Sequence, residues 1–369
     1  MKRMLREWLV PGAAAGVALR CAVVLLCGFL WSAGGASAQE ISAKAGVVID
    51  GSSGKILYAK NPHLKLPPAS TTKLVTAMVA LDRMSPERIV TVSANAAETP
   101  SVAPHLKAGE KVTVRDLLYL ALMRSVNGAA VALAEASAGS EEAFAAMMNE
   151  KVQSIDAENT HFVNASGLPG PDQYITAYDL ARVMTESLRY PLITEIINTR
   201  TKYIVTPEGR RYFLKNTNQL LWTDEDLVGG KTGYTRAAQH CFVCAAEKGD
   251  AILIAAVLGE SVREGLWHES AILLSKGYDV IMKKSEPMIY YTSVNERKVM
   301  RASYTVEGPR KTGAKTKKER VSASKRSRQR RSDDNLSKGT ARANGGSRVR
   351  GKSKGDQRSS ARTVGKDQS

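Results

Sequence analysis

Ser70 and Lys73 are the pair of residues that most directly indicates covalent chemistry in this sequence. A hydroxyl and an amine three positions apart share one face of a helix, with about 5 to 6 Å between their Cβ atoms. A serine hydroxyl is a weak nucleophile at neutral pH unless a neighbour accepts its proton, and a lysine can do so when burial or nearby cations keep it neutral. The pair therefore predicts a serine nucleophile with a lysine as its base.

Two more short motifs could complete such a site, one from Ser125 to Asn127 and one from Lys231 to Gly233. All three motifs also have copies elsewhere in the chain, so no single motif decides the matter. The copies are Ser52 with Lys55, Ser322 with Lys325, Ser93 with Asn95, Ser293 with Asn295, and Lys311 to Gly313.

The surroundings of each copy separate the candidates. Ser70 heads an apolar helical pattern after the constrained run 66–69, whereas Ser52 lies in a turn and Ser322 in a polar tail. Lys231 precedes a strand-like run, with Gly233 where another segment could approach closely, whereas Lys311 has no apolar neighbours. We therefore take the motifs at Ser70, Ser125 and Lys231 as the functional set.

Strands are expected at both ends of the body of the chain. Turn residues at 50–54 separate two short β-like runs, and residues 248–250 separate two alternating apolar runs, so each end predicts a hairpin. The expected strands are 45–49, 55–58, 240–247 and 251–258.

Helical patterns fill the middle of the chain. Thr113 with Asp116 and Thr176 with Asp179 have the spacing of capping boxes. Because strands from the two ends must meet in one sheet with the helices inserted between them, the order predicts an α/β (α+β) domain with an antiparallel sheet. The expected helices are 70–81, 113–124, 128–136, 141–155, 177–188 and 271–282.

Three longer runs extend the motifs. Residues 68–73 read Pro-Ala-Ser-Thr-Thr-Lys, a turn at 164–169 reads Asn-Ala-Ser-Gly-Leu-Pro before 176–181, and 231–235 read Lys-Thr-Gly-Tyr-Thr. In order and spacing the chain resembles the serine-type D-alanyl-D-alanine carboxypeptidases, the low-molecular-mass penicillin-binding proteins, over about 41–278. The resemblance implies a β-lactamase/DD-peptidase-like fold: an antiparallel sheet flanked by helices, with an inserted helical subdomain.

The resemblance also implies roles for the first two motifs. Ser70 would be acylated by the penultimate D-alanine of a peptidoglycan stem peptide, with release of the terminal D-alanine, and β-lactam antibiotics would acylate it as covalent inhibitors. Lys73 would accept the proton of Ser70. Ser125 would relay a proton to the leaving amine, and Asn127 would hold the substrate amide.

The third motif would bind the substrate. Lys231 would keep the site electropositive, Thr232 would bind the terminal carboxylate, and Gly233 would allow close approach. The backbone N–H groups of Ser70 and Tyr234 would form the oxyanion hole. No cofactor is implied, and no metal is expected, since the five histidines lack the spacing of a Ser-His-Asp or zinc site.

Two positions depart from the pattern of the family. Val126 stands where the family often has glycine, and Ala238-Gln239 replaces a small Ala-Gly pair. Neither change removes a reacting group, so they bear on substrate preference and the shape of the site.

Three other functions compete with a carboxypeptidase. A β-lactamase would want a deacylating Glu, commonly in a Glu-x-x-x-Asn loop, and no such pattern lies between Asn127 and Lys231. A D,D-endopeptidase that cuts peptidoglycan cross-links needs the same residues in a more open cleft. A catalytically inactive protein held in the cell envelope by its tail is the non-enzyme alternative, and covalent labelling by a fluorescent penicillin would exclude it.

The excess of basic residues lies at the ends of the chain. The formal net charge is +17, yet 308–369 hold 20 basic and 5 acidic residues, whereas 39–307 hold 29 and 30. We therefore expect a catalytic domain at 39–282, a short extension at 283–307 and a disordered basic tail at 308–369. The tail could bind anionic envelope polymers or lipid headgroups, and no nucleic acid is expected.

The first 38 residues resemble an export signal, with basic residues, an apolar run at 21–31 and Ala-Ser-Ala at 36–38. The run is about half of the ~20 residues that span a bilayer, so we expect cleavage and a periplasmic or envelope location, soluble or peripherally associated.

Cys241 and Cys244 remain after such cleavage. On a strand, positions i and i+3 point to opposite faces about 10 Å apart, too far for a disulfide. We expect buried free thiols.

Overall fold

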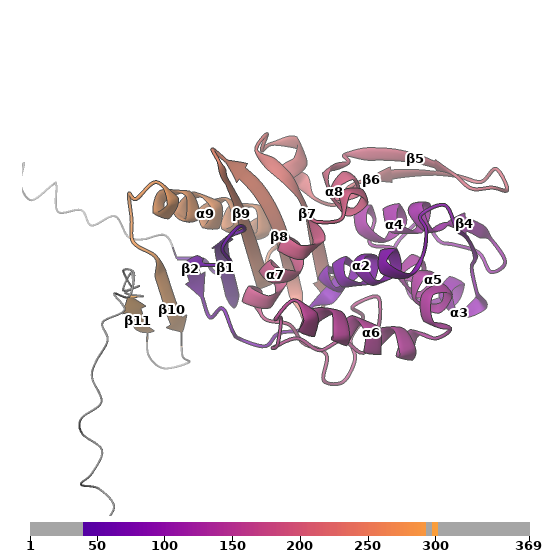
Figure 1. Ribbon diagram of the computed structural model, residues 1–369, viewed down its shortest axis with the longest axis horizontal. Coiled ribbons are helices and arrows are strands. Elements are labelled where there is room, and N and C mark those ends of the chain that lie inside the picture. The colour runs from indigo at the N-terminus through magenta and orange to yellow at the C-terminus, as the bar shows by residue number, and fades with distance from the viewer. Residues whose placement is uncertain (1–39, 293–296, 302–369) are drawn as a thin grey trace, which may run out of the picture. The chain divides into compact units, whose positions relative to one another are not determined.

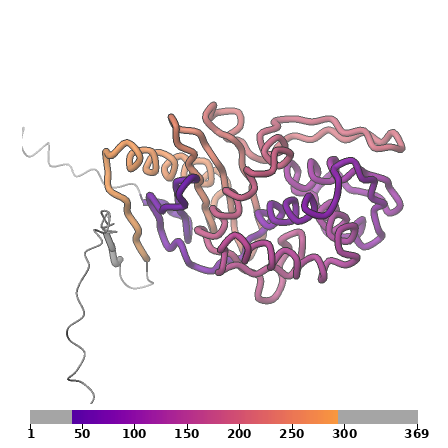
Figure 2. The backbone as a smooth tube through the Cα atoms, viewed as in Figure 1, coloured from indigo at the N-terminus to yellow at the C-terminus, as the bar shows by residue number. Residues whose placement is uncertain are grey.

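The computed structural model describes residues 40–292 and 297–301. Seven of the described strands form one sheet, in the order β11-β10-β2-β1-β9-β8-β7. Their bounds are β1 Ala45–Asp50, β2 Ile56–Lys60, β7 Leu227–Thr235, β8 Gln239–Lys248, β9 Ala251–Glu260, β10 Met288–Thr292 and β11 Arg297–Arg301. Strands from both ends of the body therefore meet in one sheet, as the sequence predicts, and Figure 2 shows the indigo N-terminal strands beside the orange C-terminal part.

The sheet is mixed, so the expectation of an antiparallel sheet is wrong at one pair. β10 runs parallel to β2, while the other described pairs of this sheet are antiparallel. After β9, the helix α9 (Arg263–Ile281) crosses the sheet and returns the chain to the end at which β9 began. A strand added after such a crossover runs parallel to the strand before it. Residues 288–292, expected in a short extension, thus continue the main sheet.

Alternating side chains of the sheet fill two cores. Val47 and Ile49 belong to the first core, between the sheet and the helical subdomain, whereas Val48 belongs to the second core, beneath α9. Cys241 and Cys244 divide in the same way, and both are buried free thiols, as predicted. Burial raises the pKa of each thiol to about 12.

The helical subdomain lies between β2 and β7 in the chain and to one side of the sheet in space (Figure 1). Thr113 and Thr176 accept hydrogen bonds from the backbone N–H groups of Asp116 and Asp179, which confirms both threonines as N-caps. Its helices are η1 Ala69–Thr72, α2 Lys73–Arg83, α3 Ala94–Glu98, α4 Val114–Met123, α5 Asn127–Ala138, α6 Glu141–Ser154, α7 Ala177–Ser187 and α8 Pro191–Asn198.

Several elements differ from the expectation or were not foreseen. The helix expected at 70–81 begins as the 3₁₀ turn η1 and continues as α2, and the helix expected at 271–282 begins eight residues earlier as α9. Two small hairpins and a second 3₁₀ turn complete the subdomain. They are β3 Ile89–Thr91 with β4 Lys111–Thr113, β5 Thr201–Val205 with β6 Arg211–Lys215, and η2 Gln219–Trp222.

The expected export signal and basic tail lie outside the described residues. Within the described part of the chain, no helix is both long and apolar enough to cross a bilayer.

Candidate active site

Lys73 is the centre of the site. Its side chain is fully buried, and its Nζ lies 3.0 Å from Ser70 Oγ, 2.7 Å from Asn127 Oδ1 and 2.6 Å from the carbonyl oxygen of Ser166. The short turn η1 carries Ser70 and leads directly into α2, whose first residue is Lys73. The first two motifs therefore meet at one nitrogen.

The surroundings of Lys73 favour the neutral amine. Burial in the protein interior lowers its pKa well below the ordinary value, and the nearby Lys231 lowers it further, while Glu141 opposes both. A neutral amine has two hydrogens and one lone pair. Asn127 Oδ1 and the Ser166 carbonyl can only accept, so they take the two hydrogens. The lone pair is left for the proton of Ser70.

Lys231 joins the second and third motifs. Its Nζ donates to Ser125 Oγ at 3.1 Å and to the carbonyl oxygen of Thr232 at 2.8 Å. Lys231 is also fully buried, and desolvation lowers its pKa to about 7. Ser125 has a φ of 63°, in the left-handed region, at the turn between α4 and α5. Such a conformation is costly for a residue with a side chain and is concentrated at functional sites.

Asn127 is held from three directions. Its backbone N–H donates to Ser101 Oγ at 2.8 Å, and its Nδ2 donates to the carbonyl oxygen of Pro100 at 2.6 Å, while its Oδ1 accepts from Lys73. The structure thus places Asn127 as a partner of the base. The sequence reasoning missed Ser101 and Pro100, for which no motif provides a signal.

Strand β7 brings the third motif against η1. A Cβ atom built on Gly233 would lie 2.9 Å from the backbone nitrogen of Ser70, so only glycine permits this approach. Thr232 Oγ1 lies 2.6 Å from Thr217 Oγ1, a hydroxyl that the sequence reasoning also missed. Tyr234 is exposed at the edge of the site, with its ring 4.5 Å from that of His240.

The two departures from the family pattern have different consequences. Val126 is 1% exposed and packs in the first core, so its side chain does not narrow the site. Gln239 has a φ of 61°, a conformation that glycine adopts without strain, and its Nε2 donates to the carbonyl oxygen of Arg236 at 3.1 Å.

The turn at 164–169 shapes the site from the side of Lys73. Asn164 Oδ1 accepts from the backbone N–H of Gly167 at 2.7 Å, which fixes the turn and with it the Ser166 carbonyl. Gly167 has a φ of 77°, and a Cβ atom there would lie 1.8 Å from the carbonyl oxygen of Ala69. The resemblance singled out this turn, but nothing in the sequence indicated that its backbone accepts from the base.

Gly167→Ala is expected to lower the free energy of unfolding by about 3 to 5 kcal/mol, because it adds a backbone clash to a left-handed conformation. Gly209→Ala is the matched control, since its φ is 83° and nothing lies within 4 Å of the added Cβ atom. We expect a loss of about 1 to 2 kcal/mol there. Urea unfolding of both variants measures the difference, and equal losses would contradict the clash.

The other copies of the motifs have local roles where the structure describes them. Ser52 Oγ donates to Asp50 Oδ1 at 2.7 Å within the turn between β1 and β2, and Ser93 caps α3 through the backbone N–H of Ala96. The copies at Ser293, Lys311 and Ser322 lie outside the described residues.

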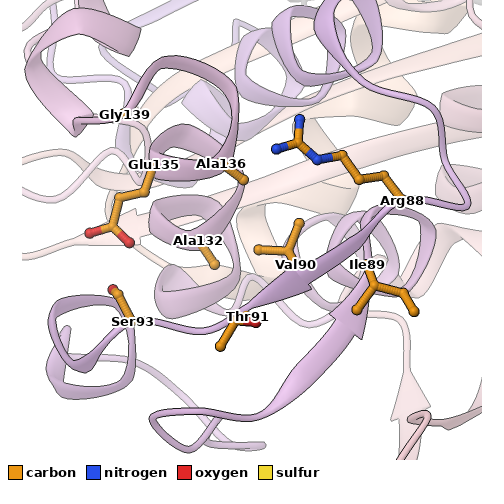
Figure 3. Close-up of a pocket in the computed structure, with 9 residues that line it drawn as sticks. All are labelled: Arg88, Ile89, Val90, Thr91, Ser93, Ala132, Glu135, Ala136 and Gly139. Atoms are coloured by element: carbon orange, nitrogen blue, oxygen red, sulfur yellow. The ribbon is translucent and has the colours of Figure 1, made fainter.

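A surface hollow of about 500 Å³ lies between β3 and α5, with Arg88 and Glu135 on its rim (Figure 3). None of the predicted site residues lines it. In the described part of the chain, no three His, Cys, Asp or Glu side chains are grouped to hold a metal ion.

Known proteins resemble this chain in sequence and in fold. The family model described as D-alanyl-D-alanine carboxypeptidase, Peptidase S11, matches residues 32–262. The D-alanyl-D-alanine carboxypeptidase DacF of Bacillus subtilis is 37% identical over 224 residues, which are 59% of this chain and 58% of DacF. The D-alanyl-D-alanine endopeptidase of Pseudomonas aeruginosa is 37% identical over 213 residues, 56% of this chain and 67% of the relative.

Solved structures agree with the sequence comparisons. The D-alanyl-D-alanine carboxypeptidase of Mycobacterium tuberculosis superimposes with a TM-score of 0.62 at 31% identity, covering 67% of this chain and 94% of that one. The Streptomyces K15 DD-transpeptidase gives a TM-score of 0.61 at 28% identity, covering 65% and 98%. The fold is therefore that of the DD-peptidases, and the chain belongs to the D-alanyl-D-alanine carboxypeptidase family, Peptidase S11.

Proposed function

We propose that the protein is a serine-type D-Ala-D-Ala carboxypeptidase that removes the terminal D-alanine from peptidoglycan stem peptides through an acyl-enzyme on Ser70. The observation that carries this proposal is the buried Lys73 Nζ at 3.0 Å from Ser70 Oγ, with two fixed acceptors for its hydrogens. A hydroxyl and a neutral amine in this arrangement are equipped for nucleophilic attack on a carbonyl carbon.

Acylation would proceed in two steps. The lone pair of Lys73 takes the proton of Ser70 as Oγ attacks the carbonyl carbon of the penultimate D-alanine. The negative charge on the carbonyl oxygen faces the backbone N–H groups of Ser70 and Tyr234, a type of stabilisation that contributes about 3 to 4 kcal/mol per donor. The amide bond then breaks as Ser125, held by Lys231, delivers its proton to the leaving amine and receives in turn the proton that Lys73 took from Ser70, so that Lys73 is neutral again.

Deacylation would reverse the attack with water in place of the amine. Water adds to the ester carbon on Ser70 as the neutral Lys73 takes its proton, and the ester bond breaks as Lys73 returns that proton to Ser70 Oγ, which frees the shortened peptide and the serine. A β-lactam would enter by the same attack on its ring carbonyl, which opens the ring and leaves a covalent acyl-enzyme.

The third motif would position the terminal carboxylate. Thr232 and Thr217 present two hydroxyls 2.6 Å apart, and Lys231 supplies positive charge beside them when it is protonated. A carboxylate accepts charge-assisted hydrogen bonds from such groups. This recognition requires a free carboxylate on the residue that leaves, and the terminal D-alanine of a carboxypeptidase substrate has one.

An endopeptidase is the second candidate, because relatives of similar identity carry both names: 37% for the carboxypeptidase DacF and 37% for the Pseudomonas endopeptidase. Mass spectrometry separates the two functions. The protein is incubated with a pentapeptide ending in D-Ala-D-Ala and, separately, with a cross-linked peptide dimer. Release of free D-alanine supports the carboxypeptidase, whereas cleavage of the dimer alone would overturn it in favour of the endopeptidase.

The rate of β-lactam acylation is expected to rise with pH until Lys73 is deprotonated. The rate rises because only the deprotonated amine of Lys73 can accept the proton of Ser70. Since the pKa of Lys73 is lowered, the rise should occur below the pH range in which a lysine ordinarily titrates. Stopped-flow acylation by a chromogenic β-lactam between pH 5 and 10 measures it. In Lys231→Met the rise should move to higher pH, because the Lys231 cation lowers the pKa of Lys73. A rate that falls throughout this range would contradict a neutral Lys73 as the base.

We further propose that the protein is exported and acts in the periplasm or cell envelope, with its basic tail as an electrostatic tether. The tail at 308–369 has a net charge of +15, from 20 basic and 5 acidic residues. Each basic residue near an anionic surface contributes about 1 kcal/mol, an attraction that salt screens.

Truncation after Glu307 is expected to leave turnover of a soluble D-Ala-D-Ala peptide within about twofold of the full chain and to weaken binding to purified envelopes at low salt. The difference in binding should vanish as salt is raised. Cosedimentation at several salt concentrations measures it, and equal binding of both forms at low salt would exclude the tether.

A further inference from the structure

The β5–β6 hairpin buries one face and exposes the other. Ile204, Tyr212 and Leu214 point into the first core. The alternate positions form an outer face, whose apolar members Tyr203, Val205 and Phe213 are 73%, 57% and 54% exposed. The outer face consists of Thr201, Tyr203, Val205, Arg211, Phe213 and Lys215.

The composition of the outer face is unusual for a solvated surface. Tyr203 and Phe213 are direct cross-strand partners, and their ring centroids lie 4.9 Å apart. Arg211 and Lys215 flank Phe213 along β6, and none of the six residues is acidic. The face thus combines a two-ring aromatic surface with two cations, a combination suited to a ligand that has both apolar faces and negative charge.

The far end of the hairpin is anchored to the helical subdomain. Glu110, which is 7% exposed, accepts from Arg210 at 2.7 Å and from the Tyr212 hydroxyl at 2.6 Å. Glu208 Oε2 accepts from the backbone N–H of Lys111 at 3.1 Å, beside β4 (Figure 1). The outer face is therefore preorganised, which lowers the entropic cost of binding.

The near end of the hairpin leads into the active site. Thr217 follows β6 by two residues, and its hydroxyl lies 2.6 Å from that of Thr232, while its backbone N–H donates to the Met123 carbonyl. Arg124 also contacts the carbonyl oxygen of Lys215. The outer face is therefore connected to the active site through the two residues that follow β6.

We propose that the outer face binds the glycan strand of peptidoglycan next to the stem peptide in the active site. The C–H faces of the sugar rings would stack on Tyr203 and Phe213, whose ring faces carry negative charge density. Arg211 and Lys215 would pair with carboxylates of neighbouring stem peptides. This inference rests on the proposed function. A second copy of the chain that paired through the same face is a poorer occupant, because it would double the positive charge in the contact without adding an acidic residue.

The test compares a soluble and a polymeric substrate. The double variant Tyr203→Ser, Phe213→Ser should keep kcat/KM for a soluble pentapeptide within about twofold of the unmodified protein and lose about tenfold in D-alanine release from insoluble peptidoglycan. Tyr291→Ser is the matched control, because Tyr291 is a 40% exposed aromatic residue on β10. The control should match the unmodified protein on both substrates.

Binding is measured separately in a Ser70→Ala background, so that failure of the proposed catalysis does not obscure the result. Cosedimentation with purified peptidoglycan in high salt suppresses electrostatic binding by the tail and retains stacking. We expect the double variant to bind about tenfold more weakly than its Ser70→Ala parent. Equal binding and equal release would overturn the inference. A shift from dimer to monomer in the double variant would also overturn it and would assign the face to a second copy of the chain. If the double variant lost binding to lipid vesicles but kept its binding to peptidoglycan, the face would be assigned to a lipid surface.

Discussion

Ser70→Ala is expected to abolish covalent labelling by a fluorescent penicillin and to lower turnover of a D-Ala-D-Ala peptide by at least about 10⁴-fold. Without Oγ no ester bond can form, and the remaining groups can only orient the substrate. The fold should persist, because Ser70 is only half-buried and its hydroxyl is hydrogen-bonded to the side chain of Lys73 alone among the described residues. Gel fluorescence and mass spectrometry of the intact protein measure the labelling, and thermal unfolding measures the fold.

Ser52→Ala is the matched control for Ser70→Ala. Ser52 also precedes a lysine by three residues, but its hydroxyl donates to Asp50 within a turn. The control should label like the unmodified protein. Persistent labelling of Ser70→Ala, or its loss in Ser52→Ala, would show that the wrong serine had been chosen.

Lys73→Ala is expected to lower β-lactam acylation by about 10³-fold or more, because Ser70 loses its proton acceptor. The variant also leaves Asn127 Oδ1 and the Ser166 carbonyl without their buried donor, at a cost of about 1 to 3 kcal/mol in the free energy of unfolding. Acylation must therefore be measured well below the melting temperature of the variant.

Two lysines serve as controls for Lys73→Ala. Lys55→Ala and Lys325→Ala change the other copies of the motif and should acylate normally. Normal acylation by a folded Lys73→Ala protein would assign the base to another group, with Lys231 as the remaining amine in the site.

The sequence predicted the parts of the site that depend on short-range spacing. These parts are local patterns: the pair Ser70 and Lys73, the N-cap threonines and the alternation around Cys241. Local backbone geometry determines on which face of a helix or strand each of these side chains lies. Two of the other motif copies have local roles of the kind that sequence patterns indicate, since Ser52 makes a hydrogen bond within a turn and Ser93 caps a helix.

The features that the sequence did not reveal depend on distant segments. The parallel pairing of β10 with β2 joins residues more than 200 positions apart, and no local pattern selects the sheet edge at which a strand is added. Thr217 meets Thr232 only because β6 ends beside β7, and Ser166 acts through its backbone, which side-chain patterns do not describe. The strand β7 begins at Leu227, four residues before Lys231. The sequence did not reveal this start, because two glycines interrupt the apolar alternation before Lys231.

The placement of Cys241 and Cys244 on opposite faces of β8 imposes an order of events during folding. In an unfolded chain thiols three residues apart collide freely and can be oxidised to a disulfide, which requires Cα atoms within about 7 Å. A strand holds those atoms about 10 Å apart, so an oxidised chain cannot form β8, the strand between β7 and β9. Once β8 has formed, burial keeps both thiols protonated and unreactive. In an oxidising compartment, therefore, the formation of β8 must be faster than thiol oxidation. An oxidant present at the start of refolding should lower the yield of folded protein, whereas the same oxidant added after folding should leave the protein folded.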